Sequence, residues 1–260
     1  MKYSVCIEMM FLEVDFYDRF KLAKEAGFDY VEFWSWNDKD LDKIISLCQQ
    51  YGIKIASFSG DQDYSLCDDS VSDEYVDWMV QSFKTANKLD CDTVIIHSNQ
   101  LVESGLVANY YEDVSDERLV ANMVKTLLKL KPLAEEYGVT MELEALNTKV
   151  DHVGNFLWHT DAAGDIVRAV DCDKLGVIYD MYHMQIMHGD LLAVLEKNFD
   201  VISYIHIADN PGRCEPGTGE INYGYIIQKL KEMDYKGYVG FELSASVNSA
   251  LAVEAIKKVW

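Results

Sequence analysis

The sequence predicts a closed (β/α)₈ barrel, and three observations lead to this fold class. Short β-branched or aromatic runs alternate strictly with amphipathic helical segments along the chain. Such alternation requires parallel strands joined by right-handed crossovers. Eight pairs fit into 260 residues, which is the usual size of one barrel of this kind. An open sheet with extra helices is the alternative, because it shares the same alternation.

The first half of the chain contains four of these pairs. The expected strands are 3–10, 29–34, 54–59 and 93–98, and the helices after them are 15–27, 39–52, 72–89 and 115–138. Gly27, Gly52 and Gly138 end three of the helices, because glycine readily takes the left-handed conformation that satisfies the last carbonyl groups. Ser72 and Ser115 are the expected N-caps of two helices, since their hydroxyls can accept bonds from free amides.

The second half repeats the pattern. The expected strands are 139–146, 175–180, 202–209 and 238–243, and the helices are 160–170, 189–199, 222–233 and 246–260. Thr160 and Asn222 are the expected N-caps of two of these helices. The chain has only three prolines and contains no stretch with the composition of a linker. We therefore expect residues 1–260 to form a single domain.

Charge and composition exclude several classes of function. The chain carries 44 acidic against 23 basic residues, so it lacks the positive surface with which proteins bind nucleic acids or anionic membranes. No run of about 18 uncharged apolar residues is present to cross a membrane. The cysteines show no close pairing and the N-terminus shows no secretion signal, so we expect reduced thiols and a cytoplasmic protein. A homo-oligomer stays open, with Trp260 as a residue that could lie between copies.

Function should lie at the carboxyl ends of the strands, where barrels of this kind bind their ligands. The last four expected strands each end in or near a metal-binding side chain, namely Glu144, Asp180, His206 and Glu242. Three carboxylates placed together would repel one another unless a cation neutralises them. This donor set has no thiolate and favours one Mn²⁺, Mg²⁺ or Co²⁺ ion in an octahedral shell. Four protein ligands would leave two coordination positions of the metal open, which is enough to chelate a carbonyl and a neighbouring hydroxyl of a substrate.

Plainer interpretations exist for each of these residues. A single acidic residue in a barrel strand can be a layer residue or a salt-bridge partner, and His206 alone is typical of a core histidine with one partner. Only the joint pattern favours a metal. Other polar and aromatic side chains near the ends of the first, second and fourth strands are expected to fill the barrel, and two tryptophans could form an apolar wall. These residues are Glu8, Glu32, Trp34, Trp36 and His97.

Four stretches of the sequence resemble one known family. They are AKEAGFDYVEFWSW at 23–36, ELEALNTKVDHVGNFL at 142–157, YDMYHMQIMHGDL at 179–191 and IHIADNPGRCEPGTGEINY at 205–223. All four are similar to the hydroxypyruvate isomerases, within the wider xylose-isomerase-like superfamily of sugar isomerases and epimerases. The resemblance implies a TIM barrel, which is the (β/α)₈ fold, with one divalent metal ion and an isomerisation through an enediolate.

The resemblance also implies roles for individual residues. Glu144 of ELEALN is identified as the first metal ligand and one acid–base group, and Asp180 as the second ligand. Glu242 of GFEL is identified as the last ligand and the opposite acid–base group. His183 of DMYH and Arg213 of PGR are implied to contact the substrate.

His206 departs from the family pattern. Typical hydroxypyruvate isomerases carry glutamine at this position, whereas related ketose 3-epimerases carry histidine. An amide oxygen and an imidazole nitrogen both coordinate metals, so the expected metal site is unchanged. The substrate is less defined, and a ketose 3-epimerase is the alternative function.

Arg213 and His183 can also be judged without the resemblance. Arg213 lies in DNPGRCEPGTGE, a loop after the seventh strand with two prolines and three glycines, where a planar guanidinium could hold a carboxylate in a forked pair. The alternative is that Arg213 pairs with Glu215 or Glu220 in the same loop. His183 follows Asp180 by three residues, so it lies on the metal side only if a helical turn begins there.

Together these features predict an isomerase that converts hydroxypyruvate to tartronate semialdehyde, or acts on a close 2-oxo acid or sugar, with Glu144 and Glu242 exchanging the proton. A barrel that binds metal and sugar without catalysis is an alternative of another class. The DNA-repair endonucleases of the superfamily require three metals, and two bridging positions are missing here. The third strand ends in SFSGD without a histidine, and RCE follows His206 where a second Asp-x-His pair is required. The net charge of −21 also disfavours DNA.

Overall fold

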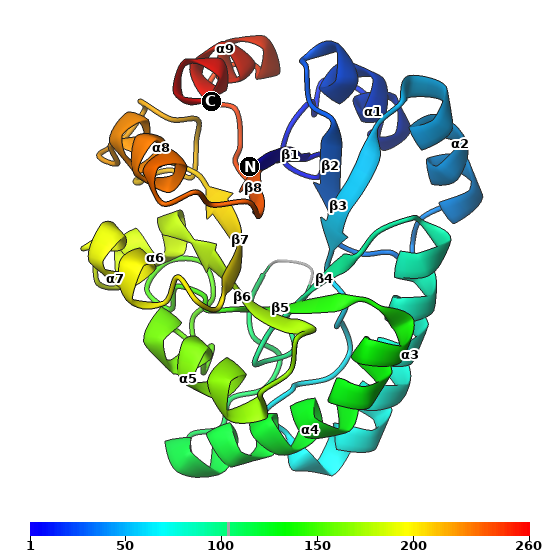
Figure 1. The fold of residues 1–260 in the computed structure, drawn as a ribbon, viewed down its shortest axis with the longest axis vertical. Helices are drawn as coiled ribbons and strands as arrows, with labels where there is room; N and C mark the ends of the chain where they lie inside the picture. The colour runs from blue at the N-terminus through cyan, green and yellow to red at the C-terminus, as the bar shows by residue number, and fades with distance from the viewer. Residues whose placement is uncertain (103–104) are drawn as a thin grey trace.

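Eight parallel strands form a barrel inside a ring of helices (Figure 1). The computed structural model describes residues 1–102 and 105–260. The strands are β1 (Lys2–Cys6), β2 (Tyr30–Phe33), β3 (Lys54–Phe58), β4 (Thr93–Ile96), β5 (Thr140–Glu144), β6 (Leu175–Asp180), β7 (Ile202–Ile207) and β8 (Tyr238–Phe241). All eight lie within or next to the predicted ranges and in the predicted order. Several end earlier than expected, as where residues 7–9 form a turn instead of continuing β1.

The barrel is nearly closed, which confirms the predicted fold class over the open sheet. The strand order is β3-β2-β1-β8-β7-β6-β5-β4, and β1 pairs with β8 through registers such as Ser4 with Gly240. The seam lies between β3 and β4, where Ser59 bridges to Ile95 and the Gly60 amide donates to the Ile95 carbonyl at 2.7 Å. A Cβ on Gly60 would lie 2.9 Å from the Cβ of Val94, so this close approach requires glycine.

The helices also follow the predicted order. They are α1 (Phe16–Glu25), α2 (Leu41–Tyr51), α3 (Ser72–Lys88), α4 (Asp116–Tyr137), α5 (Thr160–Val170), α7 (Leu191–Lys197), α8 (Tyr223–Glu232) and α9 (Ser249–Val259). Two short elements were not predicted as such, the 3₁₀ turn η1 (Asp69–Val71) and the helix α6 (Met181–Met187). α6 follows β6 directly and begins the helical turn on which the placement of His183 depends.

Two of the four predicted N-caps are confirmed and two are wrong. The side chains of Ser115 and Asn222 cap α4 and α8 by accepting bonds from backbone amides. Ser72 is the first residue of α3 and not its cap, because η1 leads directly into that helix. Thr160 is also one residue inside its helix, since the ring of His159 accepts the bond from the Asp161 amide.

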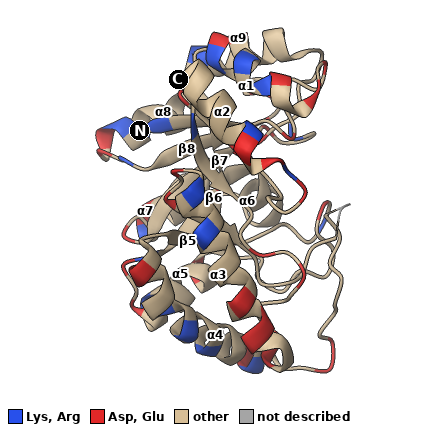
Figure 2. Cartoon of the chain, turned by 90° about the vertical axis from the view of Figure 1, so that its right-hand side faces the viewer, with Lys and Arg blue, Asp and Glu red and all other residues tan. Residues whose placement is uncertain are grey.

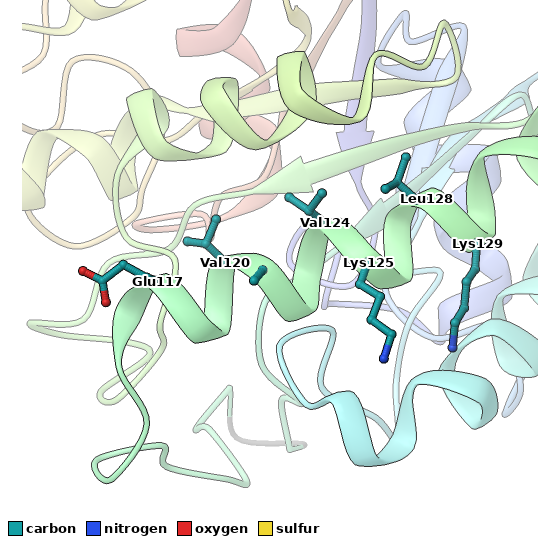
Figure 3. A pocket seen from close by; sticks show the side chains of 7 residues that line it. Glu117, Val120, Val124, Lys125, Leu128 and Lys129 are labelled. Atoms are coloured by element: carbon teal, nitrogen blue, oxygen red, sulfur yellow. The ribbon is translucent and has the colours of Figure 1, made fainter.

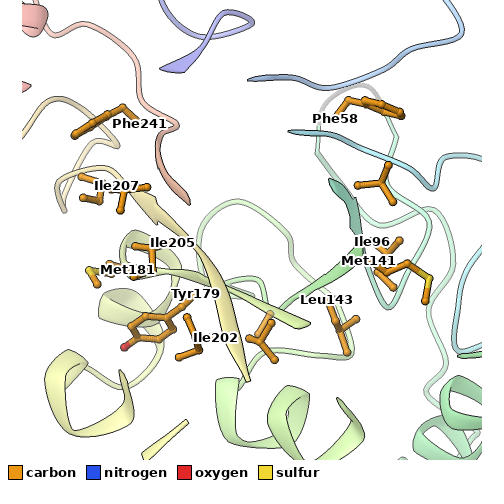
Figure 4. Close-up of a cluster of buried hydrophobic side chains, with 14 of the residues drawn as sticks. Phe58, Ile96, Met141, Leu143, Tyr179, Met181, Ile202, Ile205, Ile207 and Phe241 are labelled. Carbon is orange, nitrogen blue, oxygen red and sulfur yellow. The ribbon is translucent and has the colours of Figure 1, made fainter. Parts of the chain in front are cut away.

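The main hydrophobic core lies between the strands and the helices (Figure 4). Along β5, Met141 and Leu143 belong to this core, whereas Glu142 and Glu144 alternate with them and occupy the inside of the barrel. Burial of each large apolar side chain in this layer contributes roughly 1.5–3 kcal/mol to the free energy of folding. A second, smaller cluster inside the barrel includes Tyr204 and Tyr238. The core therefore fixes which side of each strand carries polar groups into the barrel.

The distribution of charged residues, the cysteines and Trp260 can each be compared with what the sequence predicts. Charged residues lie mainly on the helices and loops around the barrel (Figure 2). Among the described residues, no helix is both long and apolar enough to span a bilayer, and all six cysteines are free thiols. Trp260 packs within its own chain, with its ring centroid 4.8 Å from that of Tyr3 and 4.9 Å from that of Phe28.

Candidate metal and substrate site

The four side chains proposed as metal ligands meet at the carboxyl ends of four consecutive strands. Glu144 and Asp180 are the last residues of β5 and β6, His206 is the penultimate residue of β7, and Glu242 follows β8. Each offers one ligand atom that lies within 4.8 Å of the others. The Nδ1 atom of His206 is 3.7 Å from Glu144 Oε1, 4.0 Å from Asp180 Oδ2 and 3.3 Å from Glu242 Oε2. We call this group the ligand cluster.

The chemistry of the ligand cluster fits a divalent cation. Glu144 Oε1 and His206 Nδ1 face the centre of the cluster, are fully buried, and have no hydrogen-bond partner among the described residues. Buried polar atoms without a partner cost free energy, and a cation between them would satisfy both. Three carboxylates and one imidazole suit Mn²⁺, Mg²⁺ or Co²⁺ better than a thiol-preferring metal.

Glu32 contacts the side of the His206 ring that faces away from the ligand cluster. Its Oε1 atom lies 3.2 Å from His206 Nε2, and its Oε2 atom accepts hydrogen bonds from Ser4 and Tyr204. With Nε2 directed at Glu32, Nδ1 is left to face the ligand cluster. Burial lowers the pKa of His206, but the negative charges of Glu32 and Glu242 outweigh burial and hold the pKa well above its usual range. Glu32 was expected only to fill the barrel, and its contact with His206 is not visible in any local sequence pattern.

His97 and Asp61 hold Glu144 from the other side. His97 Nε2 lies 3.4 Å from Glu144 Oε2, and the carboxylate of Asp61 contacts both the His97 ring, at 3.0 Å, and the His97 amide, at 2.6 Å. Burial lowers the pKa of His97, but Asp61 outweighs it and raises the pKa to about 10. Burial raises the pKa of Glu144, but the nearby rings of His206, at 3.7 Å, and His97, at 3.4 Å, keep it below its usual range. Asp61 is not among the site residues predicted from the sequence, where its only signal is its place two residues after the expected third strand.

Arg213 joins the ligand cluster and does not pair within its own loop. Its Nη2 atom donates to Glu242 Oε2 at 2.5 Å and lies 3.5 Å from Asp180 Oδ2. Glu215 instead accepts bonds from Ser246, and Glu220 accepts bonds from Asn210 and Gln185, so the alternative pairing considered for Arg213 is wrong.

The loop around Arg213 is held at several points. The carboxylate of Asp209 accepts hydrogen bonds from the amides of Gly217, Gly219 and Ile221. The carbonyl of Arg213 accepts a bond from the Ser244 amide at 2.9 Å, which ties the loop to the end of β8. Arg213 also has a φ of 54°, a left-handed conformation that costs a non-glycine residue roughly 1 kcal/mol. The fold therefore bears strain at the residue that reaches Glu242.

Glu242 is held by groups from two loops. Trp34, just after β2, donates its indole N–H to Glu242 Oε1 at 2.9 Å, while Arg213 holds Oε2. Burial raises the pKa of Glu242, but the charge of Arg213 and then that of His206 keep it well below its usual range. Glu242 is therefore ionised and fixed in orientation.

Asp180 and His183 are linked through the start of α6. Asp180 caps this helix by accepting bonds from the amides of Tyr182 and His183, and His183 Nε2 lies 3.5 Å from Asp180 Oδ2. Asn147 donates to His183 Nδ1 at 2.6 Å, because the Asn147 carbonyl oxygen is occupied by backbone amides. Burial holds the pKa of His183 well below its usual range, so His183 is neutral with its proton on Nε2. Burial also raises the pKa of Asp180 to about 7, although Arg213 opposes it.

A cavity of about 1010 Å³ opens above the ligand cluster. Its lining includes three members of the ligand cluster, Glu144, His206 and Glu242, together with His183 and Arg213, and also Glu8, Trp34, Lys39, Gln62 and Asp151. Another hollow, of about 590 Å³, runs along the outer side of α4 between Glu117 and Lys129 (Figure 3). It contains no member of the ligand cluster, so the chemistry belongs to the first cavity.

Comparison with known proteins agrees with this arrangement. The family described as Xylose isomerase-like TIM barrel matches residues 20–259. The 2-oxo-tetronate isomerase of Haemophilus influenzae is 32% identical over 93% of this chain and 92% of its own length. The hydroxypyruvate isomerase of Escherichia coli is 29% identical over 93% of both chains. The crystal structure of AP endonuclease, family 2, from Brucella melitensis has a TM-score of 0.88 at 28% identity, covering 97% of this chain and 96% of that one.

The set of metal-binding side chains differs from what a three-metal nuclease requires. Within residues 1–102 and 105–260, the ligand cluster is the one group of three or more histidine, cysteine or acidic residues that could hold an ion. His97, which could have joined a larger set, is engaged by Asp61. The family model matches most of the chain, and isomerases are among the relatives that match it over nearly their full length. The chain therefore belongs to the xylose isomerase-like TIM barrel family, as an enzyme of its hydroxypyruvate isomerase-like group.

Proposed function

We propose that the protein is a metal-dependent isomerase of a small 2-oxo acid or ketose and acts through an enediolate. The observation that carries the proposal is the meeting of Glu144, Asp180, His206 and Glu242 at the base of one cavity. These four residues would hold one Mn²⁺, Mg²⁺ or Co²⁺ ion, which supplies a Lewis acid for the carbonyl and neighbouring hydroxyl of the substrate.

Glu144 and Glu242 are the proposed acid–base pair. They extend from β5 and from the end of β8, and both approach His206 Nδ1, within 3.7 and 3.3 Å. One removes the proton from the carbon next to the carbonyl, and the other delivers a proton to complete the rearrangement. A positioned general acid or base contributes roughly 10²–10⁴-fold to the rate. Contacts from His97 and Trp34 orient the two carboxylates before substrate binds.

Hydroxypyruvate is the first substrate to test, because two full-length relatives are named as isomerases of 2-oxo compounds. In this reaction a proton leaves carbon three and a proton is delivered to carbon two, while the proton of the hydroxyl on carbon three passes to the oxygen on carbon two, which yields tartronate semialdehyde. Arg213 and His183 are the proposed substrate contacts. Both line the cavity, and the buried Nε atom of Arg213 has no partner among the described residues, so it can donate to a substrate oxygen.

A ketose 3-epimerase is the second candidate, because His206 occupies the position where hydroxypyruvate isomerases carry glutamine. Epimerisation would use the same two glutamates, with the proton returning to the opposite face of the same carbon. A barrel that binds metal and sugar without catalysis is the third outcome, and retention of both Glu144 and Glu242 argues against it.

The setting of the protein is also proposed. We expect residues 1–260 to unfold as one domain, since β1 pairs with β8 and the two ends of the chain thereby share one sheet. The free thiols support a cytoplasmic location. A homo-oligomer remains open to measurement by light scattering, and nucleic acid is not expected as a partner of so acidic a chain.

The deciding experiment combines metal exchange with proton exchange. The protein is stripped with a chelator, reloaded with Mn²⁺, Mg²⁺ or Co²⁺, and supplied with hydroxypyruvate, longer 2-oxo acids and ketoses in D₂O. We expect product, and deuterium on the carbon next to the carbonyl. Glu144→Gln and Glu242→Gln should each abolish turnover. Metal binding without product or exchange for any substrate would favour the binding barrel.

A further inference from the structure

We propose that the part of the cavity lined by Glu8, Asp38, Lys39 and Trp34 is a subsite for uncharged hydroxyl groups. We call these four residues the outer subsite. The inference rests on the proposed function and narrows its substrate to an unphosphorylated, polyhydroxylated chain longer than three carbons.

The size of the cavity is the first argument. Its volume of about 1010 Å³ lies at the upper end of the range of roughly 300–1,000 Å³ that holds drug-sized ligands. A three-carbon acid held by Arg213, His183 and the ligand cluster would leave most of this space to water. A substrate that extends beyond Arg213, His183 and the ligand cluster would displace that water and gain contacts along the wall.

The chemistry of Lys39 is the second argument. Its ammonium lies 3.0 Å from Glu8 Oε1 and 2.9 Å from Asp38 Oδ1, and 4.9 Å above the ring of Phe16. The Lys39 side chain is only 11% exposed and that of Glu8 17%, so this ion pair is held in place. An ammonium flanked by carboxylates offers both donors and acceptors at fixed positions. Hydroxyl groups, which donate and accept, match this surface.

The balance of charge is the third argument. Seven acidic side chains line the cavity against the two cations Lys39 and Arg213, and both cations already contact carboxylates. Acidic groups outnumber positive charges even when a divalent ion is bound. A phosphate, with a charge of about −1.5 to −2 near neutral pH, would meet repulsion from Glu8 and Asp38. The tail of the substrate is therefore uncharged.

Trp34 lines the same cavity and connects this subsite to the ligand cluster. Its indole N–H is bound to Glu242, yet 45% of the residue is exposed. A large aromatic ring that stays exposed while its polar atom is fixed is typical of a binding surface. The ring face is suited to pack against the carbon chain of a sugar whose hydroxyls reach Lys39.

Substrate length tests the proposal. The specificity constant kcat/KM is measured for hydroxypyruvate, for four-carbon 2-oxo acids, for pentuloses and hexuloses, and for fructose 6-phosphate. We expect it to be at least about tenfold higher for the best unphosphorylated substrate of four to six carbons than for hydroxypyruvate, and lowest for the phosphate ester. Equal or higher kcat/KM for hydroxypyruvate, or a preference for the phosphate ester, would overturn the subsite.

Variants locate the effect. Lys39→Met and Glu8→Gln should each lower the ratio of long-chain to three-carbon kcat/KM by about tenfold, the range expected for one hydrogen bond to a charged group. Lys43→Met, which changes an exposed lysine of α2 stacked on Tyr17, is the matched control and should leave the ratio unchanged. An unchanged ratio in both cavity variants would refute the role of Lys39 and Glu8.

A binding measurement separates this proposal from the proposed function. Glycerol, xylitol and glucitol cannot react as ketoses, so their dissociation constants report the subsite even if no substrate is turned over. Calorimetry should show tighter binding of the longer polyols to the metal-loaded protein, and weaker binding of xylitol to Lys39→Met. Absence of turnover with length-dependent binding would reject the isomerase alone, whereas turnover with length-independent binding would reject the subsite alone.

Discussion

Replacing Glu142 by glutamine should make the protein more stable at neutral pH. Glu142 lies inside the barrel in β5, is 2% exposed, and accepts a hydrogen bond from Ser203 Oγ at 2.6 Å. Burial is the main cause that raises its pKa, from 4.5 to about 8, and the hydrogen bond from Ser203 opposes it. The native protein therefore keeps this carboxyl protonated at neutral pH, whereas the unfolded chain ionises it.

The sign and the size of the effect follow from this difference. Because the folded-state pKa is raised, stability is highest below pH 4.5 and is lost progressively up to about pH 8. At pH 7 the cost is on the order of 3 kcal/mol, from about 1.4 kcal/mol for each pKa unit between the unfolded value and the pH. Glutamine has no charge to bury and can still accept the Ser203 bond, so the variant should avoid this cost.

Urea unfolding between pH 4 and pH 8.5 measures the effect. The difference in free energy of unfolding between Glu142→Gln and the wild type should be near zero at the acid end and grow toward pH 8. The melting temperature at pH 7 should rise by several degrees, since about 1 kcal/mol shifts it by roughly 2–4 °C in chains of this size. Glu254→Gln, an exposed position on α9, is the control. A difference that does not change with pH would refute the buried-carboxyl explanation.

Three further variants test the site. Asp180→Asn should weaken metal binding by orders of magnitude in equilibrium dialysis, because the other ligands cannot restore the geometry; wild-type affinity would contradict its role as a ligand. Glu32→Gln should lower metal affinity about 10–100-fold by loosening the His206 ring, and an unchanged affinity would leave Glu32 as filling. Arg213→Lys should raise KM for an acidic substrate with little change in melting temperature, whereas the reverse result would indicate a structural role.

Much of this protein can be predicted from local patterns in its sequence. Alternation of β-branched runs with amphipathic segments is set by side chains a few residues apart, and it predicts the eight strands and their order. Because parallel strands of a barrel end on the same side, the residues Glu144, Asp180, His206 and Glu242 could be expected to meet before any contact was known. Helix caps were less certain, since Ser72 and Thr160 lie one residue inside their helices.

Only the tertiary structure decided which residues contact the side chains of the ligand cluster and fix their orientation. Glu32 and His206 are far apart in the sequence, and so are Asp61 and Glu144, so no periodicity links them. Arg213 has acidic neighbours in its own loop. Asp209 holds this loop by hydrogen bonds, and the Arg213 guanidinium reaches Glu242 instead of those neighbours. Local sequence determines which face of a strand is polar, whereas closure of the barrel determines which polar groups come within a few ångströms of one another and hence their charge states.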